Sequence, residues 1–265
     1  MKLNLRIFIG LVLFLGLGFL GSQAMAAETD CTFDKEAEAL VALQKNTEIG
    51  FQEKTNQELS LRQEILIKIV SCGIDEANNL KAELATVPSQ DPNIKRLKDR
   101  FSIELDQAVN YYKINGAEIE DLDLLQTKAL AKKFLDWRAN NFQYTSGGVM
   151  NLITWIGNQN FFKVSEHRFN QVAGAVRFVS LGDPESEIPA LLKESKLSLD
   201  QAKKINDEAW QALKGYSPPE KAMGLIKDSL QKLSDMYAGF LKMNEIITGS
   251  SETEDEESIS TEKEA

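Results

Sequence analysis

The chain has 265 residues, 43% of them hydrophobic, and its 40 acidic and 30 basic residues give a formal net charge of -10. This length and composition allow one domain or two small ones with a substantial core. Nucleic-acid phosphates and anionic lipid headgroups both call for a concentrated basic face, which this sequence lacks. Composition and charge therefore argue against a nucleic-acid partner and against electrostatic attachment to a membrane surface.

Residues 1–26 have the three parts of a secretory signal peptide. Lys2 and Arg6 provide the positive charge, Ile7 to Gly21 form an uncharged apolar run, and Ala24-Met25-Ala26 is an A-x-A cleavage site. The apolar run is shorter than the roughly 20 residues that span a bilayer. We expect cleavage after Ala26, no stable membrane span afterwards, and an extracytoplasmic location (periplasmic, cell-surface or secreted). A retained anchor helix is the alternative.

The chain has two cysteines, Cys31 and Cys72. In an oxidising compartment an even count predicts a disulfide. One unbroken helix from Phe33 to Val70 would hold its ends roughly 57 Å apart, whereas the Cα atoms of bridged cysteines lie within about 7 Å. The helix must therefore break, and Gly50 is a plausible stop. We predict a helical hairpin within residues 27–90, closed at its open end by the disulfide. A redox or metal pair is disfavoured because the sequence lacks C-x-x-C spacing and a histidine neighbour.

Helical periodicity and helix stop signals recur along the rest of the chain, and no alternating strand pattern of any length follows the signal region. Two prolines and a capping Asp91 mark a boundary near residue 90. The sequence thus predicts an all-α fold, with an irregular antiparallel helical bundle over residues 91–247. The expected helices are 75–87, 94–115, 117–140, one after Gly182, one from Ser198 to Gly215 and one after Ser217.

The stretch Phe142 to Gly182 is rich in aromatic residues and contains the only histidine, His167. Its neighbours have one-sided apolar stripes, so we expect this stretch to form the central core that they share. The alternative is that the same stretch lines the pocket of a small-ligand-binding protein or enzyme, with Trp155, Phe162 and His167 as its walls.

No motif for catalysis, cofactor binding or metal binding is recognisable. A di-metal bundle would need Glu-x-x-His on two helices, and the one histidine has Val164 three residues before it. The sequence also lacks G-x-S-x-G and H-E-x-x-H. We therefore predict no catalytic, cofactor or metal residues, and interpret His167 as a structural or surface residue.

The last expected helix has the most regular heptad spacing in the chain, which suits bundle packing or a coiled coil. Asn244 could fix the register of such a seam or lie solvated in the last turn. Beyond it, residues 248–265 contain seven acids and one lysine, which is typical of a disordered acidic tail. The candidate interaction seam comprises Met223, Ile226, Leu230, Leu233, Tyr237, Phe240, Asn244 and Ile247.

Together these features favour an exported, non-enzymatic helical protein of a bacterial-type cell envelope. It would act as an interaction or structural module, binding a protein partner or a second copy of itself through helix faces.

Overall fold

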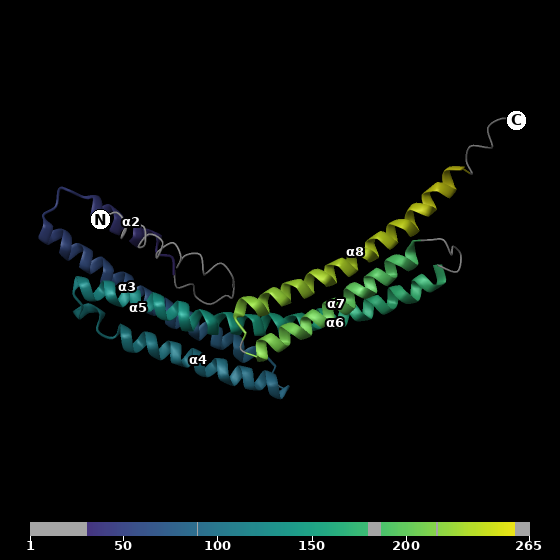
Figure 1. The fold of residues 1–265 in the computed structure, drawn as a ribbon. Helices are drawn as coiled ribbons and strands as arrows, with labels where there is room; N and C mark the ends of the chain where they lie inside the picture. The colour runs from purple at the N-terminus through teal and green to yellow at the C-terminus, as the bar shows by residue number, and fades with distance from the viewer. Residues whose placement is uncertain (1–30, 89, 180–186, 216, 258–265) are drawn as a thin grey trace. The chain divides into compact units, whose positions relative to one another are not determined.

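The computed structural model describes residues 31–88, 90–179, 187–215 and 217–257, and every regular element within them is a helix (Figure 1). The predicted all-α class is confirmed. No helix in this described part is long and apolar enough to cross a membrane. The predicted signal peptide, 1–26, and the last eight residues of the predicted tail lie outside the described residues.

The chain divides into two compact units, Met1–Val149 and Met150–Ala265. The division falls inside one long helix and not near residue 90, where the sequence predicts a boundary. The described helices of the first unit are α2 (Asp34–Lys45), α3 (Phe51–Thr86), α4 (Pro92–Gly116), the 3-10 turn η1 (Ile119–Asp121), α5 (Leu124–Trp137), the π-helical turn η2 (Arg138–Phe142) and the beginning of α6 (Gln143–Val179). The rest of α6, α7 (Ile188–Lys214) and α8 (Pro219–Glu257) form the second unit. A single bundle over residues 91–247 stays a prediction.

The predicted disulfide is confirmed. The Cα atoms of Cys31 and Cys72 are 5.8 Å apart, and the chain breaks between Lys45 and Phe51, so that α2 packs back on α3. Two side chains of this region, Phe33 and Leu40, are buried. The disulfide therefore joins the residues before α2 to the middle of α3.

α3 is longer than the sequence predicts. The separate helix expected over 75–87 is wrong, because α3 continues through Cys72 to Thr86 without a break. Gly73 lies inside this helix, and a Cβ atom there would come within 2.5 Å of the Tyr112 ring. Its missing side chain lets α4 approach α3 closely, so this glycine serves packing and not helix termination.

The next two helices begin with side-chain caps. Asp91 Oδ1 accepts from the backbone N–H of Asn93 at 2.7 Å, and Pro92 follows in the first turn, as predicted. The helix expected from residue 117 begins only at Leu124, because Asp123 and Gln126 form a capping box there. The core of this unit contains a cluster of Leu66, Tyr112, Ile119 and Phe134.

α6 is one helix of 37 residues that contains Gly147 and Gly148 in its second turn. A Cβ on Gly148 would lie 2.7 Å from the Phe101 ring, so this glycine allows close contact with α4. α6 crosses the division between the units: its residues to Val149 belong to the first and those from Met150 to the second.

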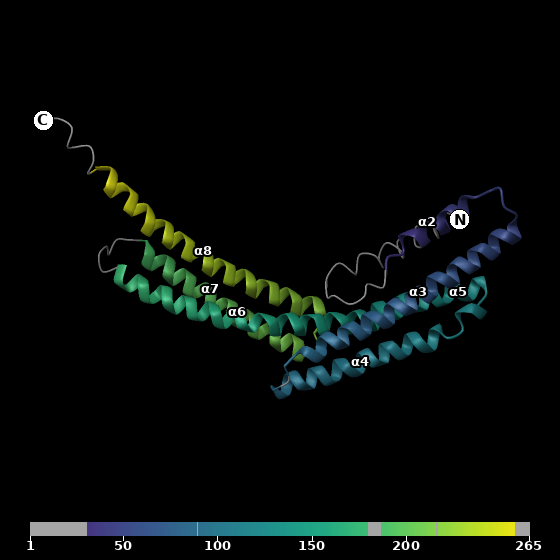
Figure 2. The ribbon, with the colours of Figure 1, turned by 180° about the vertical axis from the view of Figure 1, so that it is seen from behind.

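The second unit packs α6, α7 and α8 side by side (Figures 1 and 2). α7 begins at Ile188, so the helix start predicted at Ser198 is wrong; Leu199 and Ala202 are buried and continue the core-facing stripe without interruption. α8 begins after Pro218, as expected. The core of this unit contains two clusters of buried residues, one of Phe162, Phe169, Leu199, Ala202, Leu233 and Met236, the other of Val176, Ile188 and Met243.

α8 does not end at Ile247 but runs to Glu257, which includes the first ten residues of the predicted tail. Extending an existing helix adds one backbone hydrogen bond per residue without a new nucleation cost, and glutamate is a good helix former. The disorder predicted for 258–265 lies outside the described residues.

Candidate functional site

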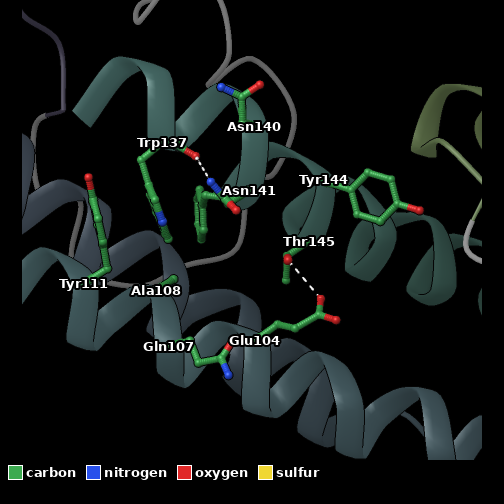
Figure 3. A pocket seen from close by; sticks show the side chains of 10 residues that line it. Glu104, Gln107, Ala108, Tyr111, Trp137, Asn140, Asn141, Tyr144 and Thr145 are labelled. Atoms are coloured by element: carbon green, nitrogen blue, oxygen red, sulfur yellow. Dashed lines mark hydrogen bonds between the residues drawn. The ribbon is translucent and has the colours of Figure 1, made fainter. Parts of the chain in front are cut away.

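The first unit contains an open hollow of about 390 Å³ between α4, the end of α5, η2 and the beginning of α6 (Figure 3). Its lining combines aromatic rings with amide, hydroxyl and carboxylate groups. Ligand pockets usually fall between roughly 300 and 1,000 Å³, which puts this hollow at the small end of that range. The lining residues are Glu104, Gln107, Ala108, Tyr111, Trp137, Asn140, Asn141, Phe142, Tyr144 and Thr145.

The π-helical turn supplies the polar rim of the hollow. Asn140 Nδ2 donates to the backbone carbonyl of Asp136 at 2.7 Å, and Asn141 Nδ2 donates to that of Trp137 at 3.1 Å. Since only the amide nitrogen can donate to a carbonyl, these bonds fix the orientation of both side chains. The two Oδ1 atoms have no hydrogen-bond donor within the described part of the chain and remain free to accept from a ligand. π-helical turns occur often at functional sites.

Three aromatic rings form one wall. Tyr111 stacks on Trp137 with ring centroids 3.9 Å apart and planes 9° apart, and Trp137 lies 6.2 Å from the nearly parallel ring of Phe142. The Tyr111 hydroxyl donates to the Lys133 carbonyl at 3.3 Å. Burial raises the pKa of Tyr111 above its ordinary value, so this side chain stays neutral at physiological pH.

The only carboxylate in the lining, Glu104, already has two partners. Thr145 Oγ1 donates to Glu104 Oε2 at 2.9 Å, and Arg100 Nε lies 3.3 Å from Glu104 Oε1. The Arg100 guanidinium also lies over the Phe101 ring, 4.4 Å from its centroid. The positive charge of Arg100 thus balances the negative charge of Glu104, and the lining of the hollow is nearly neutral.

A partly buried ion pair holds the π-helical turn against α3. Arg138 donates to both carboxylate oxygens of Glu76, at 2.7 and 3.1 Å, and its guanidinium lies 5.0 Å from the centroid of the Phe142 ring. Burial raises the pKa of Tyr112 beside this pair, although the positive charge of Arg138 partly opposes that rise. The fork of two parallel hydrogen bonds restricts the orientation of Arg138 and therefore of the turn that begins with it.

Comparison with known proteins adds no family. The chain matches no protein-family model, no curated protein and no solved structure.

The residues that the sequence suggests as pocket walls do not line this hollow. Trp155 and Phe162 are buried in the second unit, whereas His167 is exposed. Trp155 stacks on Trp210 with centroids 4.5 Å apart, and its indole nitrogen donates to the Asn206 carbonyl at 3.2 Å. Of the described residues in the stretch Phe142 to Gly182, only Phe142, Tyr144 and Thr145 line the hollow.

The heptad seam of α8 contributes mainly to the core of the second unit. Ile226 and Leu233 are buried, and Leu230, Tyr237 and Phe240 pack against a buried cluster. Met223 is half-buried. At the other end of the seam Asn244 is exposed, and Ile247 retains 41% of its accessible surface.

Sequence reasoning missed the polar residues of the hollow, above all Gln107, Asn140 and Asn141. A signal for two of them exists, since the pair Asn140-Asn141 lies between Trp137, three residues before it, and Phe142, which follows it directly. Amides between aromatic residues are a common composition of ligand sites, but the signal is weak without knowledge of the π-helical turn. Among the residues that the structure describes, no group of three or more His, Cys, Asp or Glu is placed to hold a metal ion.

Proposed function

We propose that this protein is exported to the envelope of a bacterial-type cell and acts without catalysis, binding a protein partner or a second copy of itself through helix faces. The observation that supports export is the Cys31–Cys72 disulfide. Disulfides form and persist in oxidising compartments and are rare in the cytosol. The signal-peptide pattern of residues 1–26 supports the same compartment.

The proposed binding through helix faces is supported by the C-terminal part of α8. Leu241 exposes 66% of its surface and Ile247 exposes 41%, on either side of Met243, which is buried in the core of the second unit. The helix backbone continues to Glu257, past the beginning of α7 and the end of α6 (Figure 1). An exposed helix end with apolar side chains is a surface that a partner helix can cover.

The test combines cell fractionation with site-specific photo-crosslinking in the full chain. A photoreactive amino acid at Leu241 or at Ile247 should give discrete adducts in the envelope fraction, and the adduct mass distinguishes a second copy from another protein. The matched control is the same amino acid at Lys227, an exposed position nearer the beginning of α8. Recovery of the protein in the cytoplasm, or equal labelling at all three positions, would contradict the proposal.

A second candidate function, the binding of a small ligand, is favoured by the hollow in the first unit. A hollow of about 390 Å³ with aromatic walls and free amide oxygens has the composition of a binding site. Saturable binding of a small molecule that is lost when Gln107→Trp fills the hollow would support this function. Binding that is equally strong in the filled variant would place the ligand elsewhere.

A further inference from the structure

We infer that the hollow binds a neutral, hydroxyl-rich ligand of the size of one or two sugar rings. This inference rests on the second candidate function proposed above, because it names the ligand class for the same hollow. Charge, hydrogen-bonding capacity and apolar surface each narrow the choice.

Charge excludes strongly ionic ligands. None of the ten lining residues is Lys, Arg or His, so an anion would find no countercharge in the lining. A cation would find only Glu104, whose charge is already balanced by Arg100 and whose second oxygen accepts from Thr145. A neutral ligand enters without displacing either of these partners.

The hydrogen-bonding groups of the hollow match hydroxyls. The Oδ1 atoms of Asn140 and Asn141 offer two acceptors, and each amide nitrogen uses one of its two N–H groups on a backbone carbonyl. Gln107 is exposed on α4 and offers an acceptor and two donors. A hydroxyl group donates and accepts at one atom, so neighbouring hydroxyls on a ring can bind both kinds of group at once.

The aromatic wall provides the apolar contact that a sugar ring also needs. Trp137 is held between Tyr111 and Phe142, which makes the wall rigid. Because Tyr111 and Phe142 cover the two faces of the indole, the C–H bonds of a pyranose ring pack against the half-exposed parts of Trp137 and Tyr111, while its hydroxyls point to the amides on the rim. A preformed rigid wall lowers the ordering cost of binding.

The experiment is calorimetric titration of the disulfide-bonded chain with glucose, maltose, N-acetylglucosamine and its β-1,4-linked dimer. We expect saturable binding of at least one of these sugars. Gln107→Ala should weaken it about tenfold through the loss of one hydrogen bond inside the site, and Gln107→Trp should abolish it. The matched control is Asn110→Ala, an exposed amide one turn along α4 that does not line the hollow, which should bind like the unmodified chain. Circular dichroism checks that each variant keeps its helix content.

The same titration with tetramethylammonium, acetate and the neutral dipeptide Ala-Ala separates two kinds of failure. Binding of one of these probes, lost in Gln107→Trp while no sugar binds, would overturn the sugar assignment and keep the ligand-binding function. Absence of binding by every probe to the folded chain would overturn both. Sugar binding that Gln107→Trp leaves unchanged would also overturn the inference, because the sugar would then lie outside the hollow.

Discussion

Replacing both bridged cysteines, as Cys31→Ser with Cys72→Ser, should release α2 from α3. The disulfide closes a loop with a sequence separation of 41, and the chain-entropy model gives such a closure about 4 kcal/mol of stabilisation. Small domains have only about 5–15 kcal/mol in total, so the disulfide accounts for a large share. The loss should be local, since α2 buries one residue of its own, Leu40, and Phe33 immediately before it.

Hydrogen exchange followed by mass spectrometry measures this effect directly. Amides of α2, residues 34–45, should exchange up to roughly a thousandfold faster in the double variant, which is the ratio that corresponds to about 4 kcal/mol. Amides of α7, residues 188–214, provide an internal reference because they lie in the other unit. Reduction of the unmodified chain should reproduce the variant's pattern.

One result would refute this reasoning. If α2 kept its protection in the double variant, its packing on α3 alone would suffice to hold it. The salt bridge between Lys68 and Glu36, 2.8 Å apart, and the hydrogen bond from Lys68 to the Thr32 carbonyl would then be the contacts to examine.

Three further substitutions and one pH series test the packing of the helices. Gly73→Ala should lower the free energy of unfolding in urea by about 1–3 kcal/mol, since the new Cβ atom would lie 2.5 Å from the Tyr112 ring. Gly157→Ala is the control: nothing lies within 4 Å of its Cβ position, and the substitution should raise the free energy of unfolding by up to about 1 kcal/mol. Glu76→Gln should cost about 1–3 kcal/mol, because it leaves the guanidinium of Arg138 partly buried beside a neutral group, and an equal stability in urea melts would contradict the importance of the pair. The pKa of Tyr112 is raised in the folded chain, so the folded state holds the phenol proton more tightly than the unfolded state does. The contribution of this proton to stability should be complete below pH 10 and lost as the pH rises through the folded pKa. Absorbance at 295 nm would follow the ionisation of tyrosine, and urea melts at several pH values would follow the stability.

The sequence predicted local features well where one or two side chains decide the outcome. Three such features are found in the structure, and each depends on few residues: the cap at Asp91 with Pro92, the end of α4 at Gly116, and the disulfide. The length of a helix is decided by tertiary contacts instead. At Gly73 the Tyr112 ring of α4 occupies the space of the missing side chain, and α3 continues through the glycine; a local sequence pattern does not report such a contact.

The predicted start at Ser198 failed for a related reason. The sequence has a serine followed by acidic and amide residues, which is a common helix start. However, Leu199 and Ala202 are buried on the core-facing side of a helix that is already ten residues long. Because packing favours continuation, the capping side chains lie on the helix surface, where Lys196 and Asp200 form an ion pair.

The hollow could not be predicted because it depends on one extra residue in a helical turn. Phe134 and Phe142 both contact Tyr112, with ring centroids 5.7 and 6.4 Å away. Phe142 lies eight positions after Phe134, a spacing that in a regular α-helix would place the two side chains about 80° apart around the axis. The π-helical turn η2 takes up one residue, so the effective spacing is seven and the angle falls to about 20°. The turn thereby keeps both rings in the core of the first unit while it carries Asn140 and Asn141 outward to the rim. Because this site depends on a shift in helical register, its residues follow no regular spacing in the sequence. An analysis of helical periodicity therefore cannot predict it.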